Sequence, residues 1–252
     1  MSAARQGEAA LSGWRLQIHD VLPSTSDFCR ERAAAGEAGG LAILALRQTK
    51  GRGSRGRSWE SPAGNLSLSV LLRPAETARG AAQWSLLAGV ALAESLAACL
   101  PDPSALRLKW PNDVLLGDSK LAGILVDSSA DPAGMLDWLV IGMGANLSTA
   151  PLVPGRAVAC VADLAPPPDA GQLAESILAR LTHWHAVRAS EGFEPIRAAW
   201  LARAPTPGMP VTFRLGEEVI RGAFAGLDVD GGLLLQTAEA VRTFTTGEVL
   251  LS

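Results

Sequence analysis

The stretch GLAILALRQTKGRGSRGRSWESPAGNLSLSVLL, residues 40–72, joins two predicted core strands through one basic loop. The run GLAILAL at 40–46 is apolar throughout, which predicts a strand that is buried on both faces. NLSLSVLL at 65–72 first alternates and then becomes wholly apolar, so it predicts a second core strand. Arg47 and four further cations follow the first strand, and no acid intervenes until Glu60. The loop therefore concentrates positive charge between two strands of the core.

The composition of this loop predicts an anion-binding site. Glycine N–H groups approach phosphate oxygens closely because no side chain stands in the way, and arginine binds carboxylate or phosphate at two points. Residues 51–56, GRGSRG, are not a Walker motif, since the Gly-Lys-Ser/Thr ending before a helix is absent. They are not the dinucleotide fingerprint either, because a strand follows them. From these residues alone, the anion is a nucleic acid, a nucleotide or an acyl phosphate formed in the site.

The net charge, the cysteines and the apolar segments of the chain exclude several classes of function. The net charge argues against a nucleic-acid partner. The 252 residues carry a formal net charge of -3, so the overall field does not attract polyanions. The three cysteines lie far apart and outside any CxxC pattern, which favours neither a disulfide framework nor a zinc cage. The N-terminal segment lacks the apolar run of a signal peptide, and the most apolar helix candidate, 84–100, is too short to cross a membrane. We expect a cytoplasmic protein that binds neither nucleic acid nor membrane.

The pattern outside the loop predicts an α+β fold, a mixed β-sheet packed with helices, followed by a small β barrel. A helix follows the capping residues PSTSD at 23–27 and runs to about residue 35. Besides the two core strands, the expected elements are strands at 14–18, 106–110, 113–116, 121–129 and 138–147, and helices at 81–100, 170–189 and 194–203. After Pro205 only short strands and turns follow, which is typical of a small barrel at about 209–251. The predicted domains are therefore 1–204 and 205–252.

A second polar segment, KWPNDVLLGDSKLAGILVDSS, occupies residues 109–129. It places Asn112 and Asp113 at a strand break and Lys120 at the start of an apolar strand. A lysine beside a buried strand is unusual, because lysine is rarely buried without a partner. Taken alone, however, the pattern favours a solvated turn lysine over a catalytic one.

Five segments, taken in order, resemble the biotin protein ligases: PSTSD, QTKGRGSRGRSW, KWPNDVLL, KLAGIL and GMGANL. The resemblance covers nearly the whole chain from about Trp14. It implies a biotin/lipoate ligase-like catalytic domain and a C-terminal SH3-like barrel. It also implies that biotin and ATP, with Mg²⁺ accompanying the nucleotide, form biotinyl-5'-AMP. The biotinyl group then passes to a lysine of a biotin carboxyl carrier protein domain of a carboxylase. The barrel is implied to assist with ATP and the acceptor, without a catalytic constellation of its own.

The resemblance also implies roles for individual residues. Lys120 would bridge the biotin carboxylate and the α-phosphate, Arg57 would contact a phosphate, and Asp113 would assist with magnesium or the incoming amine. The implied biotin-binding positions are Ser24, Thr25, Ser26, Gln48, Arg52, Gly53, Ser54, Lys120 and Gly123. The implied nucleotide-binding positions are Arg57, Trp59, Asn112, Lys120 and Asn146, and no protein ligands to a metal are implied.

Several of these residues also have a structural explanation. The hydroxyl groups at 24–26 suit an ordinary helix cap, and Asp113 suits an acceptor in a turn. Trp59 and Trp110 would cover a ligand in the functional reading, whereas burial in the core is the commoner fate of tryptophan.

Ser54 departs from the pattern of the family, whose loop usually reads GRGR where this chain has GRGS. The missing arginine would help to hold the adenylate, so we expect a site that activates biotin but retains the adenylate less tightly. Because the mixed anhydride is open to hydrolysis, we also expect residues 51–59 to act as a lid that is mobile without ligand.

Three other functions compete with this reading. A lipoate ligase or octanoyltransferase shares the catalytic fold, but such relatives usually carry an RRxSGGG-like segment in place of RGSRGRSW. A nucleic-acid-binding module has little support from a net acidic chain with 5% aromatic residues. A biotin-binding protein with weakened catalysis would fit Ser54.

About 13 residues precede the first strand, which leaves no room for the DNA-binding domain that some family members carry. The resemblance also allows a homodimer paired through sheet edges.

Overall fold

The computed structural model describes residues 10, 11 and 13–250 of the chain. The expectations about the N-terminal segment, namely that it holds neither a signal peptide nor a DNA-binding domain, concern residues outside those described. Residues 251 and 252, the last two of the predicted C-terminal domain, also lie outside them.

Eight strands form one mixed sheet in the order β1-β2-β3-β4-β8-β7-β6-β5. Neighbours β2 and β3 run parallel, and the other neighbouring pairs run antiparallel. The bounds are β1 (Ala10–Leu11), β2 (Trp14–His19), β3 (Leu41–Ala45), β4 (Leu66–Leu72), β5 (Leu106–Lys109), β6 (Asp113–Leu116), β7 (Ser119–Ala130) and β8 (Leu136–Ala145). The short β1 was not predicted, since two residues carry no readable period.

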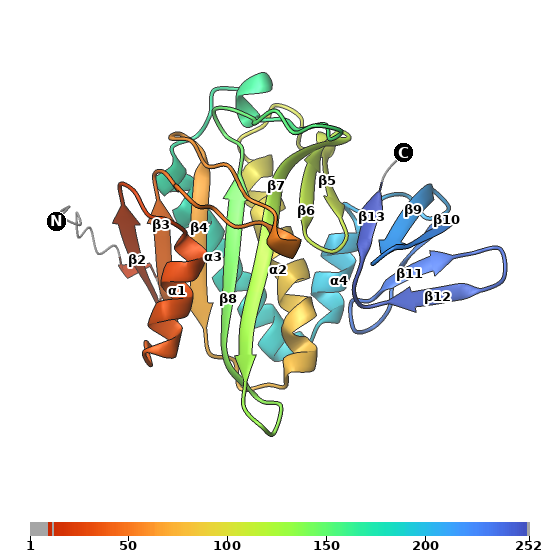
Figure 1. Cartoon of the computed structure of the whole chain (residues 1–252), viewed down its shortest axis with the longest axis horizontal. Coiled ribbons are helices and arrows are strands. Elements are labelled where there is room, and N and C mark those ends of the chain that lie inside the picture. Colours follow the sequence, from red (N-terminus) through yellow and green to blue (C-terminus); the bar gives the residue numbers. More distant parts are fainter. Residues whose placement is uncertain (1–9, 12, 251–252) are drawn as a thin grey trace.

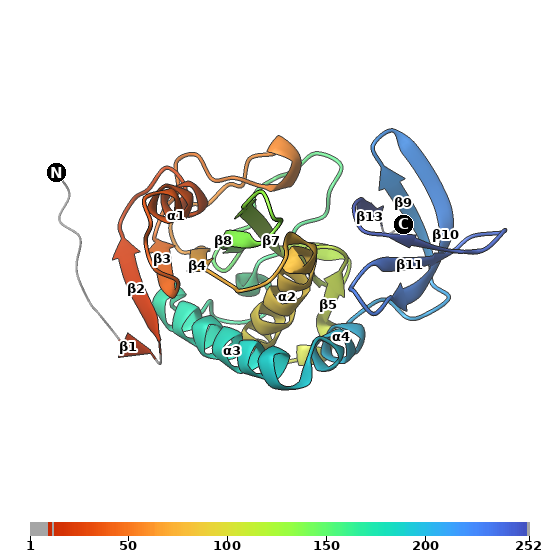
Figure 2. The ribbon, with the colours of Figure 1, turned by 90° about the horizontal axis from the view of Figure 1, so that it is seen from below.

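Helices lie on both faces of this sheet (Figures 1 and 2). Helix α1 (Thr25–Ala34) packs on β3, β4 and β8, while α2 (Ala81–Ala97) packs on the opposite face against β5, β6, β7 and β8. Helices α3 (Ala170–Glu191) and α4 (Glu194–Leu201) pack against α2. Because α2 lies between the sheet and other helices, it is apolar on nearly every side. It ends three residues earlier than predicted, before Pro101, and within the described chain no helix is both long and apolar enough to cross a membrane.

The basic loop leaves and rejoins the sheet at one end. Strands β3 and β4 pair antiparallel, with Ile43 opposite Ser69. The loop that connects them therefore starts and finishes at the same end of the two strands. On its other side β4 pairs with β8, with Ser69 opposite Gly142. The loop therefore folds over the ends of strands that form the centre of the sheet.

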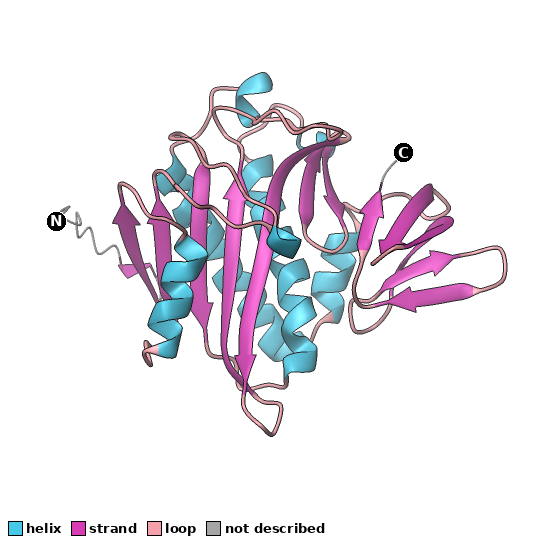
Figure 3. Cartoon of the chain, in the orientation of Figure 1, coloured by secondary structure: helices cyan, strands magenta, loops and turns pink. Residues whose placement is uncertain are grey.

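The C-terminal part forms a separate five-stranded antiparallel sheet in the order β12-β11-β10-β9-β13 (Figure 3). Its strands are β9 (Pro210–Leu215), β10 (Glu218–Leu227), β11 (Leu233–Gln236), β12 (Val241–Phe244) and β13 (Glu248–Leu250). Trp110, which is 4% exposed, donates from Nε1 to the carbonyl of Gly231 at 3.1 Å and packs on Phe213. Trp110 therefore packs between the two sheets and covers neither of the two cavities described below. Together the two sheets confirm the predicted fold class.

Candidate active site

A small cavity lies between the N-terminus of α1, the basic loop and strands β7 and β8. Ten of the residues proposed from the sequence line it: Thr25, Ser26, Gln48, Arg52, Gly53, Ser54, Trp59, Asn112, Lys120 and Gly123. Its free volume is about 40 Å³, which holds no more than a few water molecules. A ligand of the size of biotin therefore requires the loop above it to move.

Hydroxyl and amide groups form a connected network on one wall of the small cavity. The side-chain carbonyl of Gln48 accepts from the backbone N–H of Thr25 at 2.7 Å, and its amide donates to Ser61 at 3.0 Å. The hydroxyls of Thr25 and Ser26 lie 2.8 and 3.1 Å from the hydroxyl of Ser69. Ser69 was not predicted, although its place in the alternating half of β4 was a usable signal. The network offers donors and acceptors suited to a polar, uncharged group.

Ser24 lies beside this network but does not line the cavity. It is 2% exposed, and its hydroxyl accepts from the backbone N–H of Asp27 at 3.2 Å. That contact satisfies one of the free N–H groups at the start of α1. For Ser24, the structure shows the helix-capping role that the sequence offered as the structural explanation.

Glycines form the floor of the small cavity. A Cβ atom at Gly144 would lie 2.5 Å from the indole of Trp59, and one at Gly123 would lie 2.9 Å from Nζ of Lys120. A side chain at either position would displace a group that faces the cavity. Gly142 plays the same part, since its Cβ would lie 2.4 Å from the hydroxyl of Ser26. Gly142 and Gly144 alternate in the segment GMGAN, but neither was among the predicted site residues.

Arg52 fastens the basic loop across the small cavity. Its guanidinium donates to Asp27 on α1 at 3.0 Å and to Asp127 on β7 at 2.8 Å. Burial alone would lower the pKa of Arg52, but its two carboxylate partners raise it above its ordinary value. Arg52 therefore lines the cavity as predicted, while its charge is directed to carboxylates of the protein. Neither Asp27 nor Asp127 was singled out in the sequence.

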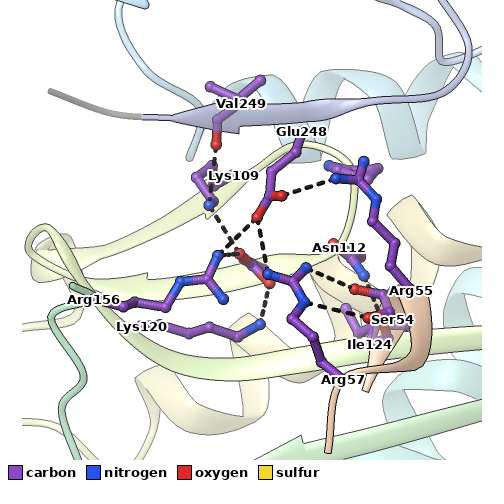
Figure 4. Close-up of polar contacts among 12 residues, drawn as sticks. Ser54, Arg55, Arg57, Lys109, Asn112, Lys120, Ile124, Arg156, Glu248 and Val249 are labelled. Carbon is purple, nitrogen blue, oxygen red and sulfur yellow. Dashed lines mark hydrogen bonds and ion pairs between the residues drawn. The ribbon is translucent and has the colours of Figure 1, made fainter. Parts of the chain in front are cut away.

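Asp113 joins Lys109 and Lys120, the two lysines labelled in Figure 4. Its carboxylate forms an ion pair with Lys120 and another with Lys109, the latter at 2.9 Å. Burial favours the neutral form of Asp113, but the two ammonium groups outweigh it and lower the pKa. Burial also lowers the pKa of Lys120, which the carboxylate of Asp113 opposes. Lys120 is thus a partly buried cation held by one acid, and not a solvated turn lysine.

A second acid, Glu248 of β13, holds three arginines in the same region (Figure 4). Its carboxylate lies 2.8 Å from Arg55, 2.9 Å from Arg156 and 3.4 Å from Arg57. Burial favours the neutral form of Glu248, but Arg57, Lys109, Arg156 and Arg55 lower its pKa overall. We call these seven charged residues the ionic cluster: Arg55, Arg57, Lys109, Asp113, Lys120, Arg156 and Glu248. Five cations against two acids leave an excess of three positive charges, which suits a phosphate chain.

A larger cavity of about 390 Å³ opens on the other side of Lys120. Arg57, Asn146, Arg156 and the loop at 151–154 contribute to its lining. Asn146 is 1% exposed and donates from Nδ2 to the carbonyl of Ala159 at 3.0 Å, but its Oδ1 accepts no hydrogen bond within the described structure. A buried acceptor without a donor is costly and is typical of a site completed by a ligand. Asn112, predicted beside the nucleotide, instead lines the small cavity and donates to the carbonyl of Ile124 at 2.7 Å.

Four residues line both cavities: Gly53, Ser54, Trp59 and Lys120. The ammonium of Lys120 also lies 5.5 Å from the centre of the Trp59 ring. Lys120 is therefore the cation at the junction where ligands in the two cavities would meet.

Comparisons with known proteins agree with this geometry. Residues 19–146 match the model of the biotin/lipoate A/B protein ligase family, and residues 207–252 match that of the biotin protein ligase C terminal domain. The chain is 37% identical over 224 residues to a biotin--[acetyl-CoA-carboxylase] ligase of Paracoccus denitrificans, covering 86% of this chain and 93% of that one. It is 34% identical over 251 residues to the Mycobacterium tuberculosis ligase of the same name, covering 95% of this chain and 90% of that one.

A solved structure shows the same fold. The biotin protein ligase from Aquifex aeolicus in complex with biotin and ATP superimposes with a TM-score of 0.79 at 28% identity, covering 93% of this chain and 97% of that one. The fold, the cavities and these relatives agree, and the chain belongs to the biotin protein ligase family.

Proposed function

We infer that the protein joins biotin to ATP to form biotinyl-5'-AMP and pyrophosphate, and then transfers the biotinyl group to a lysine of a biotin carboxyl carrier domain. The observation that carries this conclusion is the position of Lys120, whose side chain lines both cavities. One cavity has the polar wall suited to biotin, and the other has the cations suited to a nucleotide.

The small cavity is assigned to biotin. The ureido group of biotin presents a carbonyl oxygen and two N–H groups, and the wall made by Thr25, Ser26 and Gln48 offers partners for both kinds. In this placement the acid tail of biotin extends toward Lys120. The loop through Arg52 and Trp59 then covers the ligand and excludes water from the reacting groups.

Lys120 has the charge and the position needed for the first reaction step. The biotin carboxylate attacks the α-phosphorus of ATP, so two anions must approach each other. At 4 Å their repulsion is about 1 kcal/mol in water and about 4 kcal/mol at an effective dielectric of 20. The ammonium of Lys120 offsets that repulsion and stabilises the charge that develops on the phosphate oxygens. The new bond joins carboxylate oxygen to phosphorus, and pyrophosphate leaves with the electrons of the broken P–O bond.

The larger cavity is assigned to ATP. The free Oδ1 of Asn146 would accept from the amino group of adenine, while the bond from its Nδ2 to Ala159 fixes the orientation of the amide. Arg57 and Arg156 line the same cavity and would contact the phosphates. The loop at 151–154 would cover the nucleotide, and its Leu152 is 97% exposed without one.

Magnesium is assigned to the substrate, as the partner of the ATP phosphates. Within the residues that the structure describes, no group of three or more His, Cys, Asp or Glu side chains is arranged to hold a metal ion. Asp113, the acid that pairs with Lys120, is already bound by two lysines. Its lowered pKa also makes it a weak base toward an acceptor ammonium. We therefore assign Asp113 to holding Lys120 and Lys109 rather than to proton transfer.

In the second step, the neutral amine of the acceptor lysine attacks the acyl carbon of biotinyl-5'-AMP. An amide bond forms, the acyl–oxygen bond to AMP breaks, and the proton of the amine passes to solvent. Strand β7 continues beyond the end of β6, and from about Val126 its only sheet partner among the described residues is β8. We propose this edge as the place where the carrier domain or a second copy of the chain pairs with the sheet.

Four further assignments belong to the same proposal. We place the boundary between the two domains near residue 205, in the segment between α4 and β9. We place the protein in the cytoplasm, with neither a nucleic-acid nor a membrane partner. The formal net charge of -3 gives the chain no overall field that would attract a polyanion.

Biotin-dependent exchange of labelled pyrophosphate into ATP tests this function directly. We expect exchange with biotin and none with lipoate or octanoate. Exchange that depends on lipoate would assign the protein to the lipoate ligases. Tight biotin binding without exchange would make it a biotin-binding protein with weakened catalysis, the alternative that Ser54 raises. Salt-sensitive binding of nucleic acid without exchange would overturn the assignment to either kind of ligase.

A further inference from the structure

The C-terminal sheet contributes one acid to the ionic cluster. Glu248 is the first residue of β13, and its side chain is only 12% exposed. Its three arginine partners come from two other segments of the chain, the basic loop and the loop that contains Arg156. One carboxylate thus ties together three segments that lie far apart in the sequence.

Strand β13 is itself fixed to the catalytic domain beside Glu248. The ammonium of Lys109 donates to the carbonyl of Val249 at 3.2 Å and pairs with Asp113 at 2.9 Å. Lys109 is 7% exposed, so this contact is shielded from solvent. Asp113 in turn pairs with Lys120. The position of Glu248 is therefore tied through two side chains to the cation that lies between the cavities.

Glu248 contacts arginines of the larger cavity but does not line that cavity itself. Arg57 and Arg156 line the larger cavity, whereas Glu248 and Arg55 do not. Glu248 and Arg55 line a separate cleft that also contains Lys109, Asp113 and Arg57. A guanidinium has five N–H groups, so a carboxylate on one side leaves others free to face the cavity. The geometry thus resembles a support behind a binding group, not an acid that occupies the binding site.

The arginines need such a support. Arg55, Arg57 and Arg156 carry like charges and share the carboxylate of Glu248, so without it they would repel one another. Only Arg156 would keep a second acid nearby, Asp113 at 3.8 Å. Arg55 also has a φ of 59°, the only positive value among the described residues other than glycine. That conformation is unfavourable for a residue with a Cβ, and the ion pair of Arg55 with Glu248 holds it.

We propose that Glu248 is a positioning residue for the nucleotide. The C-terminal domain supplies the carboxylate that holds Arg57 and Arg156 facing the phosphates, so the affinity for ATP depends on a residue that does not touch ATP. The proposal rests on the assignment of the larger cavity to ATP. It names one residue through which the barrel would assist with ATP, the role that the resemblance implied for it.

The test compares Glu248→Gln with the wild-type full-length protein in pyrophosphate exchange and in calorimetric titration with biotin. Glutamine keeps the size of the side chain and removes the charge. We expect the KM for ATP to rise about tenfold, which corresponds to about 1.4 kcal/mol, while the Kd for biotin changes less than twofold. Glu248→Asp, which restores the charge on a shorter side chain, should recover part of the loss. Glu218→Gln is the matched control, because Glu218 faces Arg242 at 3.8 Å within the same sheet.

Each outcome decides the question. An unchanged KM for ATP in Glu248→Gln would overturn the proposal, and a lowered KM would show that the carboxylate competes with phosphate. Equal losses of ATP and biotin affinity, with a lowered melting temperature and no recovery in Glu248→Asp, would show a purely structural role. Absence of biotin-dependent exchange in the wild type would instead refute the proposed function. Exchange by the wild-type protein is therefore measured before any variant is compared.

Discussion

The guanidinium of Arg52 lies 2.8 Å from the carboxylate of Asp127, so the basic loop is fastened to strand β7 directly above the small cavity. A second contact, at 3.0 Å, joins the same guanidinium to Asp27 on α1. Since the cavity beneath has a free volume of only about 40 Å³, biotin enters only after these contacts loosen. We therefore expect these two contacts to break when biotin enters and to form again over the bound ligand.

Replacement of Asp127 by asparagine should loosen this fastening. We expect amide hydrogen exchange of residues 51–59 to become several times faster in the free protein, because one of two charged partners of Arg52 is lost. Biotin should also dissociate faster. Asp137→Asn is the control, since Asp137 lies on the neighbouring strand and only faces the hydroxyl of Ser129 at 3.5 Å. Equal exchange in the two variants, or exchange that is already slow and insensitive to biotin in the wild type, would contradict a mobile lid.

Replacement of Lys120 by glutamine should remove most of the activity. We expect kcat for pyrophosphate exchange to fall by about 10² to 10³, because a cation that offsets charge in the transition state is lost. The Kd for biotin should change much less than kcat. Lys50→Gln removes an exposed cation from the same loop and should leave exchange within twofold of the wild type. A loss in Lys120→Gln no larger than that in Lys50→Gln would remove Lys120 from the reaction.

Replacement of Ser54 by arginine should slow the release of the adenylate. Ser54 lines both cavities, and its hydroxyl accepts from Arg57 at 3.2 Å, so an arginine here would place a further cation beside the phosphate. We expect dissociation of biotinyl-5'-AMP to slow about tenfold, the effect of one charge-assisted hydrogen bond. Ser54→Gln adds a long uncharged side chain and is the matched control. An unchanged dissociation rate in Ser54→Arg would show that Ser54 does not set retention of the adenylate.

The ionic cluster should make the stability of the protein depend on acid. The pKa values of Asp113 and Glu248 are both lowered in the fold, so their ionised forms stabilise it above the unfolded values, about 3.9 and 4.3. That contribution is lost as the pH falls through the lowered values. Chemical denaturation of the wild type and Glu248→Gln should therefore show a clear difference at pH 7 that shrinks toward pH 3. A difference of the same size at both pH values would contradict the assignment of this acid dependence to Glu248.

The sequence predicted those site residues that stand in short, recognisable motifs. Lys120, Gln48 and Thr25 stand in short motifs whose residue types suit the chemistry, and the structure places all three at the small cavity. Ser24 shows the limit of that reasoning, because a serine before a helix has the same local pattern whether it caps the helix or binds a ligand. Its hydroxyl accepts from the backbone of Asp27.

The long-range pairs could not be predicted from one sequence. Arg55 and Glu248 are 193 positions apart, and Arg156 and Glu248 are 92 apart. An acid at the start of a short strand and an arginine in a proline-rich loop are both ordinary surface residues by their local patterns. Only the packing of the second sheet against the segment Lys109–Asp113 brings them together. The strands were predictable because the period of apolar residues is a local property, whereas this packing is not.

Glu248 follows every other member of the ionic cluster along the chain, and this order has a consequence during translation. A nascent polypeptide that has emerged only as far as the first sheet already holds Lys120 and the glycine-rich loop, but Arg55 and Arg57 still lack their acid partner, Glu248. Competence to capture ATP should therefore arise late in synthesis, when the final strand docks.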